Sequence, residues 1–186
     1  MKLEGKTAVV TGGARRLGRA MALALASRGV RVAVHYAQSR EQAEETVSMA
    51  IELGTEAISL QADLSQEDPA HRVIAQAADQ FGIVDILMNN AALFEPGGFA
   101  QTTSEDWDRH FSVNLKAPFL LSQDFAAQVP TDRKGKIVNL GDWRGLRPGR
   151  DHFAYTIAKA ALVGLTEATA LALAPNIQVN CLALGA

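Results

Sequence analysis

Hydrophobic residues along the chain gather into short, β-branched runs that alternate with longer stretches rich in alanine and leucine. Short apolar runs predict buried strands, and apolar residues spaced three or four apart predict helices. Strands are therefore expected near residues 6–11, 30–36, 56–61, 84–89, 136–141 and 177–182. Helices are expected near residues 16–28, 39–53, 66–81, 103–128 and 152–174. This alternation predicts an α/β fold in which helices cover both faces of a parallel sheet.

Residues that commonly begin or end helices lie between these predicted elements. Gly29 and Gly54 follow two of the helices, Pro175 follows the last, and Ser39 and Ser65 are candidate N-caps. No repeat or linker divides the chain, and its 186 residues are enough for one hydrophobic core. We therefore expect residues 1–186 to form a single domain.

Composition and charge narrow the functional class. The net charge of -2, without a polybasic segment, disfavours nucleic acid and anionic membranes as partners. Cys181 is the only cysteine, which excludes an intrachain disulfide or a cysteine-based zinc cluster, and we expect no metal site. We expect a cytoplasmic protein, because no signal-peptide-like stretch is present. The apolar stretch 153–174 contains Tyr155, Lys159 and Glu167, which favours a buried or interface helix over a membrane span.

Residues 11–18, between the first predicted strand and helix, read Thr-Gly-Gly-Ala-Arg-Arg-Leu-Gly. A Gly-rich turn at this place lets the backbone approach a pyrophosphate, whose charge meets free N–H groups at the helix N-terminus. The segment resembles the threonine-glycine cofactor motif of the short-chain dehydrogenase/reductase family. That resemblance implies a Rossmann-type, doubly wound sheet in three α/β/α layers. It also implies cofactor contacts from Thr11, Gly12, Arg16, Leu17 and Gly18.

Arg16 stands where most members of that family have the middle glycine, a replacement familiar in the pteridine-reductase branch. Its guanidinium is expected to reach the cofactor phosphates or a substrate beside them. The end of the second strand carries no carboxylate, which an NAD-selective site would use to bind the ribose hydroxyls. Ser39 and Arg40, together with Arg16 and with Tyr36 beside them, can instead bind a 2′-phosphate. We therefore expect NADPH as the cofactor, with a solvated charge as the alternative for Arg40.

Two further segments follow strands at the edge where open α/β sheets bind ligands. Asp63 and Leu64 follow the third strand, and Asn90 and Ala91 follow the fourth. The resemblance implies that Asp63 hydrogen-bonds the adenine amino group, and that Asn90 with Ala91 braces the loop beneath the adenine ribose. Taken alone, Asp63 and Asn90 would be ordinary turn residues.

Tyr155 and Lys159 are four residues apart, so they share one face of the predicted helix. Their spacing matches the family's catalytic signature. A phenol titrates near pH ~10, and a neighbouring ammonium lowers that pKa, so Lys159 is expected to adjust Tyr155 as a proton donor. The resemblance implies that Lys159 also holds the nicotinamide ribose. It further implies that Asn114 bends its helix and anchors a water that connects Lys159 to solvent.

Asp142 occupies the position, thirteen residues before the tyrosine, where most family members carry a serine. A carboxylate would repel the alkoxide charge that develops in ketone reduction, but it suits a substrate that offers N–H donors. The Asp–Tyr–Lys set resembles pteridine reductases and bacterial dihydromonapterin reductases. Phe94 stands where those enzymes have a phenylalanine that stacks on the flat pterin. Ala92 and Leu93 depart from their pattern, because polar residues are usual there.

The leading interpretation is therefore an NADPH-dependent reductase of a pterin or dihydropterin, with Arg16, Phe94, Asp142 and Tyr155 contacting the substrate. A carbonyl reductase of the 3-oxoacyl-carrier-protein type and a non-catalytic NADP-binding regulator are the alternatives. The resemblance implies a homotetramer or homodimer that pairs through the last two long helices. It also implies a substrate-covering segment beyond the sixth strand, which this sequence does not contain.

Overall fold

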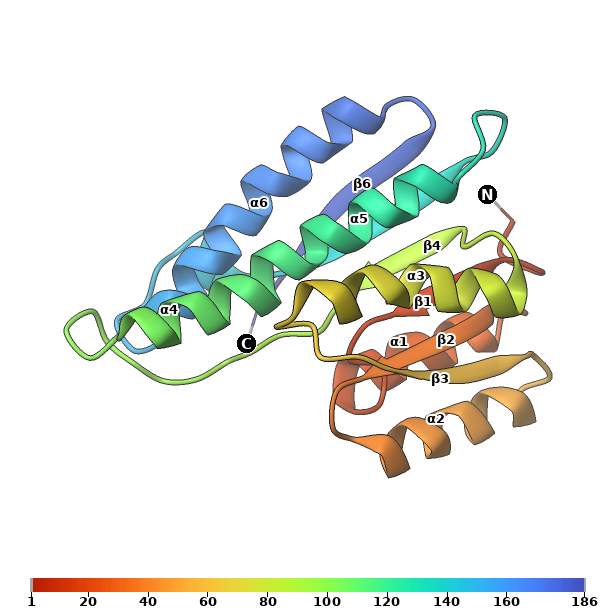
Figure 1. Cartoon of the computed structure of the whole chain (residues 1–186), viewed down its shortest axis with the longest axis horizontal. Coiled ribbons are helices and arrows are strands. Elements are labelled where there is room, and N and C mark those ends of the chain that lie inside the picture. The colour runs from red at the N-terminus through yellow and green to blue at the C-terminus, as the bar shows by residue number, and fades with distance from the viewer. Residues whose placement is uncertain (1, 186) are drawn as a thin grey trace.

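The computed structural model describes residues 2–185 as a six-stranded, wholly parallel sheet in the order β3-β2-β1-β4-β5-β6 (Figure 1). The strands are β1 (Thr7–Val10), β2 (Arg31–Tyr36), β3 (Ala57–Gln61), β4 (Ile86–Asn89), β5 (Gly135–Asp142) and β6 (Ile177–Leu184). All six predicted strands are confirmed, with small changes at their ends. The central strands form because their apolar residues are buried by helices on both sides.

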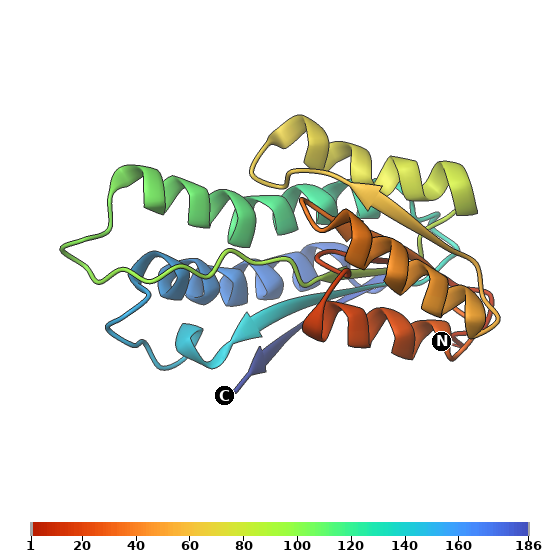
Figure 2. The same ribbon diagram turned by 90° about the horizontal axis from the view of Figure 1, so that it is seen from below.

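Helices cover both faces of the sheet, which confirms the predicted three-layer α/β/α architecture (Figure 2). The α-helices are α1 (Arg16–Ala26), α2 (Arg40–Glu52), α3 (Glu67–Phe81), α4 (Ser104–Phe111), α5 (Ala117–Gln128) and α6 (Phe153–Leu173). Helices α1 and α2 pack on one face, and α3, α5 and α6 lie on the other. One hydrophobic core therefore forms on each face of the sheet.

The helix predicted over residues 103–128 is present as one continuous helical run, in which a π-helical segment (Ser112–Lys116) joins α4 to α5. Pro118 has no N–H to donate to the carbonyl of Asn114, so the regular α-helical pattern cannot continue there. The wider turn places Asn114 in the interior, where it is fully buried. This irregularity therefore sets the position of one predicted site residue.

The predicted helix caps are only partly correct. Ser39 precedes α2 as its N-cap residue, but its side chain makes no capping hydrogen bond. Ser65 is not a cap, because α3 begins after Gln66, and the backbone N–H of Ser65 instead donates to Asp63. Gly29 and Gly54 follow their helices with positive φ angles of 74° and 90°, which explains the choice of glycine.

Helix α6 is the one helix among residues 2–185 that is long and apolar enough to cross a membrane. Its inner face instead buries Tyr155, Thr156 and Lys159 within the protein. One face of the helix therefore packs into the core, which agrees with the expectation of a buried or interface helix.

Strands β1 and β4 are neighbours in the sheet although two strands separate them in the sequence. The chain runs outward in one direction from β1 to β3 and in the opposite direction from β4 to β6. At such a reversal the connections leave a crevice at the carboxyl ends of the strands, where ligands of open α/β sheets bind. The fold therefore places the candidate site above β1 and β4.

Candidate functional site

A cavity of about 400 Å³ lies at this edge of the sheet, beside the ends of β1, β2, β3 and β4. Its wall brings together six of the predicted cofactor residues: Gly12, Tyr36, Ser39, Asp63, Leu64 and Ala91. Arg15 and His35 also line it, and neither was singled out from the sequence. Residues far apart in the chain thus meet as the resemblance implied.

The Gly-rich turn can approach a ligand with bare backbone because its glycines admit no side chain. Gly12 has a φ of 62°, and a Cβ there would come within 3.1 Å of the Asn90 side chain. A Cβ at Gly18 would lie 2.1 Å from the carbonyl oxygen of Gly12. Gly18 therefore serves the turn by packing beneath it rather than by lining the cavity.

Thr11 and Asn90 brace the loops that follow β1 and β4. The buried hydroxyl of Thr11 accepts hydrogen bonds from the N–H groups of Asn90 and Ala91, both at 2.9 Å. The Asn90 amide donates to the carbonyls of Thr11 (2.7 Å) and Gly12 (3.2 Å). The bracing role that the resemblance gave to Asn90 agrees with this geometry, and Thr11 acts from behind the cavity wall.

His35, at the end of β2, supports the same turn from below and is 2% exposed. Its Nδ1 accepts a hydrogen bond from the Gly12 N–H (3.2 Å), and its Nε2 donates to the Ala62 carbonyl (3.0 Å). These partners require the neutral tautomer with the proton on Nε2. Burial accordingly lowers the pKa of His35 to about 4. A neutral ring at physiological pH therefore holds the turn.

The arginine that lines the cavity is not one of those predicted from the sequence to bind the cofactor. Arg15 and Arg16 are both exposed, but only Arg15 lines the cavity, and Arg16 starts α1 with a φ of 49°, in the region that favours glycine. Arg40 is also exposed, with Nη1 lying 3.7 Å from Glu44 Oε1 and its guanidinium 6.0 Å from the Tyr36 ring centroid. Neither Arg16, Leu17 nor Arg40 forms part of the cavity wall, so their ligand contacts remain predictions.

Asp142, at the end of β5, and Tyr155, in the first turn of α6, form the centre of the reactive region. The Tyr155 hydroxyl donates to Asp142 Oδ2 at 2.9 Å, and the backbone N–H of Arg144 donates to Asp142 Oδ1 at 2.8 Å. Both oxygens of the half-buried carboxylate are therefore engaged. Burial first, and then the hydrogen bond and negative charge of Asp142, raise the pKa of Tyr155 above its usual range.

That direction is opposite to the lowering predicted from Tyr155 and Lys159, so this prediction is wrong. The Lys159 Nζ lies 5.7 Å from the centroid of the Tyr155 ring and donates to the Leu140 carbonyl at 2.5 Å. Burial lowers the pKa of Lys159 to about 8, although the Asp142 charge opposes the shift. The sequence could not reveal this because it does not show how deeply each group is buried.

Asn114 anchors the loop that leads from the end of β4. Its amide donates to the Leu93 carbonyl (2.9 Å), and its side-chain oxygen accepts from the Leu93 N–H (2.9 Å). The predicted interruption of its helix is present as the π-helical segment. The role in a water path to Lys159 remains a prediction, while the contacts assign Asn114 a direct part in positioning the loop before Phe94.

Phe94 is 52% exposed and meets the Tyr155 ring edge-on, with ring centroids 4.7 Å apart. The predicted aromatic wall thus lies directly beside Tyr155. Ala92 and Leu93, where pterin reductases usually carry polar residues, line the cofactor-side cavity instead. Within residues 2–185, no group of three or more His, Cys, Asp or Glu side chains is arranged to hold a metal ion.

The parallel sheet, its Gly-rich turn and the cavity at its carboxyl edge define a dinucleotide-binding α/β protein. The profile described as short chain dehydrogenase matches residues 6–186. The chain belongs to the short-chain dehydrogenase/reductase family.

Three similar proteins illustrate the range of this family. The chain is 36% identical to a 3-oxoacyl-(acyl-carrier-protein) reductase of Staphylococcus epidermidis, over 97% of this chain and 74% of the relative. A structure of FolM alternative dihydrofolate reductase 1 from Brucella canis, complexed with NADP, superposes with a TM-score of 0.94 and 37% identity, covering 100% of this chain and 75% of that one. A short chain dehydrogenase from Burkholderia cenocepacia in complex with NADP gives a TM-score of 0.93 and 36% identity, covering 98% and 75%.

Proposed function

We propose that the protein is an NADPH-dependent reductase of a flat nitrogen heterocycle, a pterin or dihydropterin. Three features support NADP(H) as the cofactor: the bare backbone of Gly12, the absence of a carboxylate at the end of β2, and Arg15 and Ser39 in the cavity wall. Structural neighbours with NADP bound add support. When bound, the cofactor supplies the hydride.

The hydrogen bond from the Tyr155 hydroxyl to Asp142 carries the choice of substrate. To donate its proton to a substrate, Tyr155 must turn away from Asp142, which leaves a half-buried carboxylate oxygen without a donor. A ketone cannot replace that donor, and loss of a hydrogen bond to a partly buried carboxylate oxygen costs free energy. A pterin ring offers amino and ring N–H groups that can donate to Asp142. The pair therefore favours an acceptor that brings its own N–H donors.

Proton delivery then follows from the state of the two side chains. The raised pKa keeps Tyr155 protonated at neutral pH but makes its hydroxyl a weaker acid, so donation of the proton to a C=N nitrogen requires the hydroxyl to leave Asp142. The proton moves to that nitrogen as the adjacent carbon accepts the hydride, and the C=N double bond becomes a C–N single bond. Lys159, with a pKa of about 8, is largely protonated at neutral pH and stabilises the phenolate that remains.

The test is NADPH oxidation by the full-length protein with dihydrobiopterin, dihydromonapterin or dihydrofolate, set against a panel of ketones. The variant Asp142→Ser removes the carboxylate and supplies a hydroxyl, which can donate a hydrogen bond to a ketone oxygen. We expect it to lower kcat/KM for a dihydropterin about 100-fold and to leave the NADPH Kd unchanged. Full dihydropterin turnover by the variant would contradict the assigned role of Asp142.

Reduction of a 3-oxoacyl thioester is the second candidate function, because the relative from Staphylococcus epidermidis carries that name. Asp142 opposes it, since a carboxylate beside the carbonyl disfavours the developing alkoxide. Turnover of an acetoacetyl thioester at a rate above that of every pterin would select this candidate. A non-catalytic NADP-binding role would require tight NADPH binding without turnover of either class.

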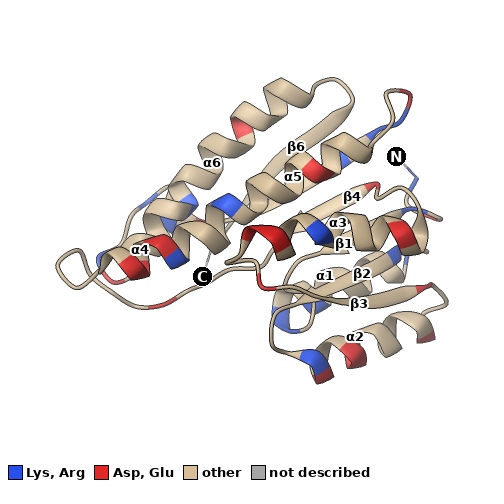
Figure 3. Cartoon of the chain, in the orientation of Figure 1, with Lys and Arg blue, Asp and Glu red and all other residues tan. Residues whose placement is uncertain are grey.

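We also propose that the protein self-associates through α5 and α6. Figure 3 shows few charges along these helices. A groove of about 690 Å³ between α6 and the run from α4 to the start of α5 is lined by Phe111, Leu115, Phe119, Ala161 and Leu165, among others. Phe119 is 41% exposed and Leu171 83% exposed, which is unfavourable in a monomer. Light scattering should show a dimer or tetramer that Phe119→Glu dissociates. The cytoplasmic location stays a prediction.

A further inference from the structure

His152 lies directly behind Phe94, three residues before Tyr155. The two rings are stacked with centroids 3.9 Å apart and an angle of 3° between their planes. The His152 side chain is 15% exposed, while Phe94 is 52% exposed. His152 therefore covers one face of Phe94, and the exposed surface of Phe94 includes its opposite face.

The backbone holds the two stacked residues together. Gly97, in the loop that carries Phe94, pairs with His152 in a parallel bridge. The Gly97 N–H donates to the Asp151 carbonyl (2.9 Å), and the Phe153 N–H donates to the Gly97 carbonyl (2.8 Å). The loop after β4 is thus attached to the start of α6, where Tyr155 lies.

An ion pair between Arg144 and Asp151 joins the start of α6 to the segment that follows β5. The Arg144 guanidinium binds both carboxylate oxygens of Asp151, at 2.5 and 3.1 Å. Asp151 Oδ2 lies 3.1 Å from His152 Nδ1, but the contact lacks the angle of a hydrogen bond. The stack with Phe94, the backbone bridge and this contact with Asp151 therefore set the orientation of the His152 ring. The Arg144 N–H also binds Asp142, so the contacts run from Asp142 to Phe94.

We propose that His152 is a positioning residue that holds Phe94 edge-on to Tyr155, so that the free face of Phe94 binds a flat heteroaromatic substrate. This inference rests on the proposed function. A phenylalanine in an exposed loop could otherwise adopt several rotamers, and fixing one of them before binding reduces the entropy lost when the substrate stacks. The flat imidazole suits this role because it covers a whole ring face, which a branched aliphatic side chain cannot do.

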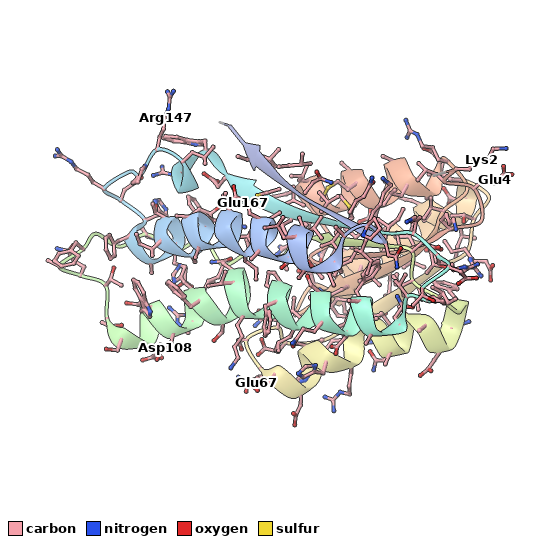
Figure 4. All side chains as sticks on the ribbon, turned by 90° about the horizontal axis from the view of Figure 1, so that it is seen from above. Lys2, Glu4, Glu67, Asp108, Arg147 and Glu167 are labelled. Carbon is pink, nitrogen blue, oxygen red and sulfur yellow. The ribbon has the colours of Figure 1, made fainter. Side chains whose placement is uncertain are left out.

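The test compares three substitutions of His152 in the full-length protein. His152→Ala removes the stack, His152→Leu keeps the bulk without a flat face, and His152→Phe restores a flat face without an ionisable nitrogen. Arg147→Ala is the matched control, because Arg147 lies in the same loop and its side chain points away from the protein (Figure 4). Measurements are dihydrobiopterin binding to the enzyme–NADP⁺ complex, KM and kcat for dihydrobiopterin, NADPH Kd and Tm.

We expect His152→Ala and His152→Leu to raise both the Kd and the KM for dihydrobiopterin about tenfold, the change that one aromatic contact gives. The kcat and the NADPH Kd should stay within about twofold, and His152→Phe and Arg147→Ala should bind like the original protein. Unchanged pterin affinity in His152→Leu, with NADPH binding intact, would overturn the positioning role alone. A defect in His152→Phe equal to that of His152→Leu would also overturn it. If the original protein binds no pterin, the proposed function and this inference both fail.

Discussion

The two halves of the site are held together in different ways. On the cofactor side, the side chains of Thr11, His35 and Asn90 bind backbone groups of neighbouring loops. On the reactive side, pairs of side chains are added to such backbone contacts, as in the pairs of Tyr155 with Asp142 and of Phe94 with His152. The contacts with backbone fix the shape of the Gly-rich turn and do not depend on the substrate. Each side-chain pair instead determines which groups face the substrate. The first half therefore indicates the cofactor class, and the second half determines the substrate.

The largest effect that separates the two halves is expected for Tyr155→Phe. The substitution removes the proton donor and leaves Asp142 Oδ2 without its hydrogen bond, while the cofactor-side contacts stay unchanged. We expect the rate of reduction to fall about 1000-fold, within the usual range for a general acid. The NADPH Kd should change by less than about twofold. Single-turnover kinetics at saturating NADPH measure the first effect, and fluorescence titration measures the second.

More than a tenth of the original rate in Tyr155→Phe would show that the proton comes from another group. A large loss of NADPH affinity would show instead that the two halves are not separable.

His35 gives the cofactor half a pH dependence of stability. Its folded pKa of about 4 lies below the ordinary value of 6.5, so below pH 6.5 the unfolded chain binds the proton more readily. The contribution of His35 to the free energy of unfolding is therefore fully present above pH 6.5, and it is lost as the pH falls toward 4. The loss amounts to about 2 kcal/mol at pH 5 and about 3 kcal/mol at pH 4. Urea unfolding without cofactor, at pH 7.5 and pH 5, measures it.

His35→Gln is the matched variant, because glutamine can donate to Ala62 and accept from Gly12 without titrating in this range. Carboxylates common to both proteins cancel in the comparison. The variant should lose about 2 kcal/mol less than the original protein between the two pH values. Equal losses would show that protonation of His35 does not open the turn.

The fold was predictable because its signals are local. Each strand is a short apolar run between polar or glycine residues, and the alternation with helices leaves few topologies other than a parallel sheet. The π-helical segment within the helix over residues 103–128 was not predictable from periodicity. It depends on Pro118 and on the buried contact between Asn114 and Leu93, which are 21 residues apart. An Asn four residues before a proline in a helix was the available signal.

The candidate site was predictable to the extent that its residues share a motif. The Gly-rich turn, Asp63 and Asn90 could be identified by their positions after strands, and Tyr155 with Lys159 by their spacing. His35 and His152 were missed because a lone histidine carries no motif. Their roles appear only when the fold brings Gly12 and Phe94 beside them. The pKa direction of Tyr155 was likewise beyond the sequence, because it depends on burial.

The smallest expected effect concerns the charges that select NADPH over NADH. Arg15 lines the cavity, whereas Arg40 lies outside its wall with Glu44 as a competing partner, so any contact of Arg40 with the phosphate is weaker. We expect Arg15→Ala to raise the Kd for NADPH about tenfold, as loss of one charge-assisted hydrogen bond would. Arg40→Ala should raise it about threefold or less. Neither substitution should alter the Kd for NADH, which lacks the 2′-phosphate. Fluorescence titration with both nucleotides, using Arg147→Ala as the control, measures these changes. If Arg40→Ala removes the NADPH preference and Arg15→Ala does not, the phosphate is bound outside the cavity, at the position that the sequence alone predicted.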